Sequence, residues 1–108
     1  MTLSPMLSPE RARALVSRFH AISVLVAGDL MLDHFVFGRV SRISPEAPVP
    51  VVDHDHDEYR VGGAGNVSHN VRALGGRVEL VGLIGRDAPA GRLRGELVTG
   101  GMGAEGLV

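Results

Sequence analysis

The sequence contains no cysteine, and because all eleven of its basic residues are arginine it contains no lysine either. The absence of cysteine excludes a disulfide framework and a thiolate zinc site. It also fits a reducing compartment. The absence of lysine excludes a Walker A phosphate loop, because that loop uses a lysine to contact the nucleotide phosphates.

Strong charge and long apolar runs are also missing. The formal net charge is −1 and the arginines are spread along the chain, so nothing favours nucleic acid or an anionic membrane as a partner. No apolar run is long enough to span a bilayer, and the N-terminus lacks the pattern of a signal peptide. With 108 residues, 44% of them hydrophobic, the composition predicts one small globular domain in the cytoplasm.

The first half of the chain contains three segments with different residue patterns. Ser8 and Pro9 suit the start of a helix, and apolar residues at helical spacing predict an amphipathic helix over residues 9–20. The run ISVLVAGD, residues 22–29, predicts a buried strand of a parallel sheet. Residues 35–61 combine short apolar pieces, three prolines and a charged tract, which predicts short antiparallel strands outside the main sheet.

The second half alternates helix and strand. A helical apolar face over residues 64–74 ends at Gly75 and Gly76, and RVELVGLIG, residues 77–85, predicts a strand. Asp87 suits the N-cap of a further helix that ends at Gly100 and Gly101, and the final GLV is a candidate for another strand.

This alternation predicts the α/β class, with an incomplete parallel sheet flanked by helices and a small antiparallel flap. The pattern supplies few strands, so we expect the chain to stop within a fold. An unpaired sheet edge and partly uncovered helix faces at Leu93 and Leu97 are further expectations.

Two motifs resemble binding sites, but the sequence favours a simpler explanation for each. Gly63, Gly65 and Ser68 approximate the dinucleotide fingerprint G-x-G-x-x-G, but the residues before them are the polar DHDHDEYRV instead of a buried strand, which argues against that site. In DHDHD, residues 53–57, strand alternation would place His54 and His56 on one face. Two histidines could begin a metal site, but a solvated, charged strand edge is favoured, and no metal site is predicted.

The stretch GDLMLD places Asp29 and Asp33 just after the first predicted sheet strand, where open α/β sheets bind ligands. An ionised carboxylate only accepts hydrogen bonds, and sugar hydroxyls donate them, so a sugar is a natural ligand. The alternative is that Asp33 caps a turn or pairs with a nearby arginine. Spacing alone leaves both open.

Four stretches, GDLMLD, SRISPEAPVPVV, GGAGNVSHNVRALGG and LVGLIGRD, occur in the order and near the spacing found at the N-terminus of ribokinase-type (PfkB) carbohydrate kinases. The resemblance covers almost all of residues 22–108. The second stretch, residues 41–52, most resembles the kinases that act on D-glycero-β-D-manno-heptose 7-phosphate, which often form the N-terminal half of a bifunctional enzyme.

The resemblance implies a ribokinase-like fold in which residues 1–108 are the N-terminal fragment of a kinase domain and residues 35–61 form a β-lid over the sugar. Gly62, Gly63 and Asn66 match the sugar-contacting segment of the family, and Asp33 matches its hydroxyl-binding aspartate. The catalytic G-A-G-D motif of the family lies later in the chain. Here GAGN ends in Asn66, whose neutral amide cannot act as a base, so no catalytic base is present and the chain alone is predicted to be inactive.

The resemblance further implies ATP and Mg²⁺ as cofactors, bound mostly outside this chain, a phosphorylated sugar as substrate, and a homodimer formed through the lid. For the phosphate that the sugar already carries, chemistry and position suggest Arg42 as the first anchor and Arg60 as the second. The competing interpretation is a non-catalytic relic or a lid-mediated interaction module.

Overall fold

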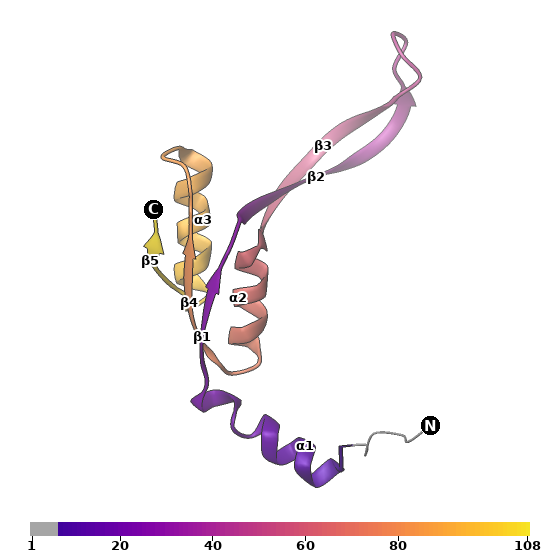
Figure 1. Cartoon of the computed structure of the whole chain (residues 1–108). Helices are drawn as coiled ribbons and strands as arrows, with labels where there is room; N and C mark the ends of the chain where they lie inside the picture. The colour runs from indigo at the N-terminus through magenta and orange to yellow at the C-terminus, as the bar shows by residue number, and fades with distance from the viewer. Residues whose placement is uncertain (1–6) are drawn as a thin grey trace, which may run out of the picture.

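A small α/β layer and a long β-hairpin make up the chain in this computed structural model, which describes residues 7–108 (Figure 1). The helices are α1 (Pro9–Val16), the 3₁₀ turn η1 (Phe19–Ala21), α2 (Ala64–Ala73) and α3 (Ala88–Thr99). The strands are β1 (Ser23–Ala27), β2 (Leu30–Ile43), β3 (Pro50–Gly63), β4 (Arg77–Gly82) and β5 (Gly103–Leu107).

Strands β1, β4 and β5 form a parallel sheet in the order β1-β4-β5, whereas β2 and β3 form a separate antiparallel sheet. In the parallel sheet Val24 pairs with Val78, and Glu79 pairs with Gly103. The α/β class, the parallel sheet and the separate antiparallel unit are therefore confirmed. The final strand begins earlier than the predicted GLV segment, at Gly103.

The first helix is shorter than predicted. Ser8 caps it as expected, since the Arg11 N–H donates to Ser8 Oγ at 3.2 Å, but α1 ends at Val16 and does not continue to residue 20. The Arg18 N–H donates to the Leu15 carbonyl, an i to i+3 bond that tightens the chain into a 3₁₀ pattern. The helical periodicity therefore spans two elements joined by a turn.

The predicted ends of α2 and α3 are confirmed. Gly75 follows α2 with φ +94° and Gly101 follows α3 with φ +69°, both in the left-handed region that favours glycine. Asp87 caps α3, because its Oδ1 accepts from the Ala90 N–H at 3.0 Å.

Both long helices cover the same face of the parallel sheet. Leu93 and Leu97 of α3 are only 5% and 0% exposed, so the expectation that they would be partly uncovered is wrong. The sheet supplies Val78 and Leu80 beneath them, and the turn into β5 adds a further buried side chain at the C-terminal end of α3. The buried cluster consists of Ala64, Val78, Leu80, Leu93, Leu97, Met102 and Leu107.

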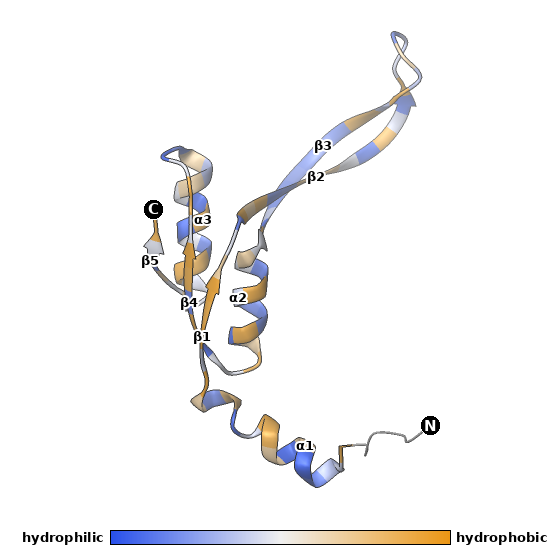
Figure 2. Cartoon of the chain, in the orientation of Figure 1, coloured by the Kyte–Doolittle hydropathy of each residue, from blue (hydrophilic) through white to orange (hydrophobic). Residues whose placement is uncertain are grey.

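Among residues 7–108, no helix covers the opposite face of the sheet. Leu25 on β1 is 66% exposed and Val81 on β4 also faces out, so the strand predicted to be buried is covered on one side only. Figure 2 shows that β1 and β4 are nevertheless strongly apolar. Parallel sheets usually bury both faces, so this face is an apolar surface that remains exposed. Within residues 7–108, no helix is long and apolar enough to cross a membrane.

The hairpin has two strands of 14 residues each and projects away from the α/β layer (Figure 1). The prediction of short strands was wrong, and the ladder extends beyond residues 35–61 at both ends. Pro45 and Pro48 fall between the strands and Pro50 is the first residue of β3, so no proline interrupts the ladder.

Candidate functional site

The base of the hairpin brings Asp33 and Gly62 together. Asp33 lies opposite Arg60 in the ladder, and Met31 lies opposite Gly62. A Cβ built on Gly62 would lie 2.6 Å from Asp33 Oδ2, so the exposed carboxylate occupies the space that a side chain at position 62 would fill. Gly62 is buried beneath it, which explains why glycine stands there.

Gly63 turns the chain from β3 into α2. It has φ +57° and forms the N-cap of α2 without a side chain, while the next residue, Ala64, donates its N–H to the Asp29 carbonyl at 2.8 Å. Asp29 is therefore tied to the helix start through its backbone. This context also argues against the dinucleotide fingerprint, because the glycines follow a hairpin strand and not a strand of the parallel sheet.

Gly65 and Ser68 have packing roles. A Cβ on Gly65 would overlap the Val61 side chain, so this glycine lets α2 approach the hairpin base. Ser68 is completely buried and its hydroxyl donates to the Ala64 carbonyl at 3.0 Å. Helix packing therefore accounts for these two of the three residues of the degenerate glycine motif.

Asn66, in the first turn of α2, lines a groove of about 250 Å³ between α2, α3 and the hairpin base. Arg60 lines the same groove, so the structure brings these two predicted residues together. His69 and Glu96 also line it and were not identified from the sequence. His69 lies three residues after Asn66, and this helical spacing is the signal that could have identified it.

Arg60 does not pair with Asp33, although the ladder places them opposite one another. Its guanidinium lies over the Phe35 ring, 5.0 Å from the centroid, and donates to Glu58 Oε2 at 3.0 Å. Within residues 7–108 no ion pair involves Asp33. The arginine-pairing alternative therefore finds no support, and the carboxylate remains an acceptor open to solvent.

Arg42 lies far from the other predicted residues. It pairs with Val51 near the tip of the hairpin, nine residues along β2 from Asp33. At about 3.3 Å per residue, that spacing corresponds to about 30 Å. A single copy of the chain therefore does not place Arg42 beside Asp33.

The two histidines of DHDHD do not share a face. Phe37 pairs with His56 and Gly38 pairs with His54, so Asp55 is an unpaired bulge residue that shifts the alternation. The His56 ring stacks on Phe37, with centroids 4.8 Å apart. The expectation of a shared histidine face was wrong, because it assumed unbroken strand alternation.

On the other face, His54 joins an exposed cluster with His34 and Asp57. Asp57 Oδ1 lies 3.0 Å from His54 Nε2 and 3.4 Å from His34 Nε2. The hydrogen bond from His54 lowers the pKa of the Asp57 carboxyl, with a smaller contribution from His34. Residues 7–108 contain no group of three or more ligating side chains arranged to hold a metal ion.

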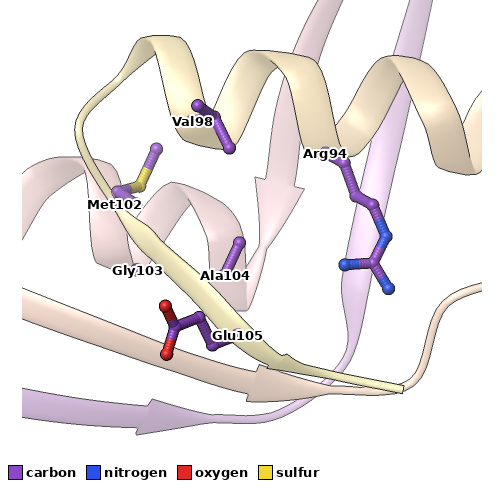
Figure 3. Close-up of a pocket in the computed structure, with 6 residues that line it drawn as sticks. All are labelled: Arg94, Val98, Met102, Gly103, Ala104 and Glu105. Carbon is purple, nitrogen blue, oxygen red and sulfur yellow. The ribbon is translucent and has the colours of Figure 1, made fainter.

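A separate hollow of about 420 Å³ lies beside the C-terminal part of α3 and β5 (Figure 3). Arg94 lines it, and this side chain donates to the Leu107 carbonyl at 3.0 Å. None of the residues predicted to bind substrate lines this hollow.

Comparison with known proteins identifies close relatives. The bifunctional protein HldE of Gluconacetobacter diazotrophicus is 56% identical over 79 residues, which is 73% of this chain and 16% of the relative. HldE of Caulobacter vibrioides is 50% identical over 91 residues, 83% of this chain and 19% of the relative. HldE of Methylococcus capsulatus is 55% identical over 84 residues, 78% of this chain and 18% of the relative.

This chain is homologous to the bifunctional HldE proteins. It spans less than a fifth of the length of these relatives. No family model matches the chain. The homology to HldE confirms the relationship that the four stretches between Ile22 and Val108 indicated.

Proposed function

We propose that this chain is the sugar-binding floor and lid of an ATP-dependent carbohydrate kinase with a ribokinase-like fold. The substrate would be D-glycero-β-D-manno-heptose 7-phosphate, phosphorylated at its anomeric hydroxyl on the route to ADP-heptose and the lipopolysaccharide core. Homology to HldE supports the kinase class. The observation that carries the sugar site is the Asp33 carboxylate lying against Gly62.

The roles follow from the chemistry of each group. Asp33 is exposed and accepts hydrogen bonds from sugar hydroxyls. Gly62 leaves room for the Asp33 carboxylate beside the sugar, and the exposed Gly63 has no side chain between its backbone and a ligand. Asn66 can both donate and accept at the start of α2. Together these groups would position the sugar. Positioning the reactants is one of the main contributions that a protein makes to phosphoryl transfer.

Arg60 is the residue near Asp33 that could bind the phosphate of the sugar. Glu58 and the Phe35 ring hold its guanidinium on the face of the hairpin that carries Asp33. A planar guanidinium suits a phosphate because it can donate two parallel hydrogen bonds.

Mg-ATP would supply the phosphoryl group, but the residues present do not fit a site for it. The chain has no lysine for the phosphates, and residues 7–108 contain no three-ligand group for a divalent cation. Asn66 cannot replace the aspartate base of the family. We therefore propose that the chain alone binds sugar without turnover.

The binding proposal can be tested with isotope-labelled chain. Adding heptose 7-phosphate should shift the backbone amide resonances of Gly62, Gly63 and Asn66, and the Asp33→Ala variant should lose this response. The Asp29→Ala variant is the matched control, because Asp29 accepts from the start of α2 through its backbone carbonyl, which alanine keeps. An unchanged spectrum in the parent chain, or an equal response in Asp33→Ala, would contradict the assignment.

A non-catalytic interaction module is the second candidate. The hairpin exposes large apolar side chains, among them Val40, Ile43 and Val52, which is a surface suited to another protein. In that case the chain would associate through the hairpin without any response to sugar. For both candidates we propose a cytoplasmic protein that forms a homodimer through the lid.

A further inference from the structure

The part of the hairpin beside the candidate site is attached to α3. Asp33 and Arg60 pair across the ladder, and the next pair toward the tip, His34 and Tyr59, faces the opposite side. The Arg92 guanidinium of α3 lies over the Tyr59 ring, 4.1 Å from its centroid. The backbone that carries Asp33 is therefore connected to α3 through the adjacent pair.

Three side chains form a stack at this point, which we call the Tyr59 stack: Arg92, Tyr59 and His34. The His34 and Tyr59 rings are nearly parallel, at 10°, and their centroids are 4.4 Å apart. Because Arg92 and His34 both lie this close to the centre of the Tyr59 ring, they occupy its two opposite faces. The stack therefore joins α3 to β3 and, through β3, to β2.

The Tyr59 stack borders a hollow between α3 and the hairpin. This space of about 310 Å³ is lined by Leu32 and Tyr59 from the hairpin and by Ala88, Pro89 and Arg92 from α3. Because side chains do not fill the space, the hairpin has room to tilt relative to α3. Among residues 7–108 no carboxylate forms an ion pair with Arg92, so the aromatic ring is the partner that holds its guanidinium.

The length of the hairpin makes the angle at its base important. At about 3.3 Å per residue, each 14-residue strand extends about 45 Å, so a tilt of about 5° at the base moves the tip by about 4 Å. A contact near the base that restricts this tilt therefore determines where the side chains of the hairpin lie, and Asp33 is among them.

We propose that Arg92 is a positioning residue for the candidate site: by holding Tyr59 against α3, it fixes the angle at which the hairpin leaves the α/β layer and thus the place of Asp33. Arg92 acts from behind the site, because Tyr59 and Asp33 lie on opposite faces of the hairpin. The effect on sugar binding rests on the proposed function, whereas the restriction of the hairpin angle does not.

A distance measurement by pulsed electron paramagnetic resonance tests the restriction, since the chain has no cysteine of its own. Spin labels on Val40→Cys in the hairpin and Val98→Cys in α3, two exposed positions, report the angle between these elements. Labelled chain is diluted with unlabelled chain, so that only distances within one chain contribute. The labelled parent should give one narrow distance distribution, and Arg92→Gln should broaden it.

Arg94→Gln is the matched control, because it is the same substitution on the same helix and Arg94 donates to the Leu107 carbonyl of β5. Its distribution should stay narrow. Tyr59→Leu should broaden the distribution as Arg92→Gln does, whereas Tyr59→Phe keeps the ring and should leave it narrow. Combining Arg92→Gln with Tyr59→Leu should add no further broadening, because both substitutions remove the same contact.

Circular dichroism verifies that each variant is folded. A narrow distribution in folded Arg92→Gln, or equal broadening in Arg94→Gln, would overturn the proposal. Broadening in Tyr59→Phe would also overturn it, since the hydroxyl and not the ring would then hold the hairpin.

Calorimetry with heptose 7-phosphate tests the link to the site. Arg92→Gln should raise the Kd about two- to fivefold, on the scale of one exposed cation–π contact, while Arg94→Gln should leave it unchanged. A broadened distribution with an unchanged Kd would overturn the positioning role. Absence of sugar binding by the parent chain would refute the proposed function alone, and the distance measurement would still decide whether Arg92 holds the hairpin.

Discussion

The Gly62→Ala substitution should impair sugar binding at the candidate site while leaving the fold nearly as stable. The added Cβ would lie 2.6 Å from Asp33 Oδ2, closer than non-bonded atoms tolerate, and 3.2 Å from Asp33 Cγ, which is a tight contact. The colliding group is the end of an exposed side chain, which can rotate away. We therefore expect a stability loss below about 1 kcal/mol, with the carboxylate displaced from its seat.

The loss of sugar binding should be larger. Displacing a charge-assisted acceptor costs about 1.5–3 kcal/mol, so we expect the Kd for heptose 7-phosphate to rise at least about tenfold, measured by calorimetry. Gly63→Ala is the matched comparison, since alanine rarely adopts its φ of +57° and the added Cβ would also overlap the Asp29 carbonyl oxygen, so we expect a loss above about 1–2 kcal/mol in unfolding free energy. Unchanged sugar affinity in a folded Gly62→Ala chain would refute the role given to Asp33.

Four further outcomes follow from the same structure. In an intact kinase that contains this segment, Asp33→Ala should raise the sugar KM about tenfold with little change for ATP, and Asp33→Asn should fall between, because the amide keeps one acceptor. The isolated chain should release no ADP from Mg-ATP and heptose 7-phosphate in a coupled assay; turnover that survives repurification would contradict this. Leu97→Ala should lower the unfolding free energy by about 2–5 kcal/mol in a denaturant titration, since Leu97 is fully buried. The lowered pKa of Asp57 contributes stability above the ordinary carboxyl pKa that is lost as pH falls through the folded pKa; His54→Ala should raise that pKa in an NMR titration.

The order of elements in the α/β layer was predictable from local signals. Asp87 and the glycines at positions 75 and 101 mark helix ends through interactions within a few residues, so their roles appear in the sequence itself. The burial of Leu97 was not predictable in this way. It depends on β5 and Met102 returning beneath α3, which is a tertiary contact.

The hairpin has features that sequence patterns cannot predict. The bulge at Asp55 is set by how β2 and β3 pair, so alternation within DHDHD could not reveal that His54 and His56 face opposite ways. The same holds for the site. Asp33 and Gly62 lie far apart in the sequence, and their contact exists because the ladder aligns β2 with β3. The resemblance to the kinase family identified both residues as candidates. Spacing alone was also compatible with a capping or pairing role for Asp33.

The core decides which face of the hairpin can bind a ligand. Leu32 and Val61, paired across the ladder, pack against the core of the α/β layer. Tyr59 on the same face lies against α3, with the Arg92 guanidinium 4.1 Å from its ring centroid. Because side chains alternate along a strand, the neighbours Asp33 and Gly62 must then face away from the core. A shift of the ladder by one residue would bury the Asp33 carboxylate and expose two apolar side chains, which the hydrophobic effect opposes. The packing that stabilises the hairpin base is thus also what presents Asp33 to a ligand.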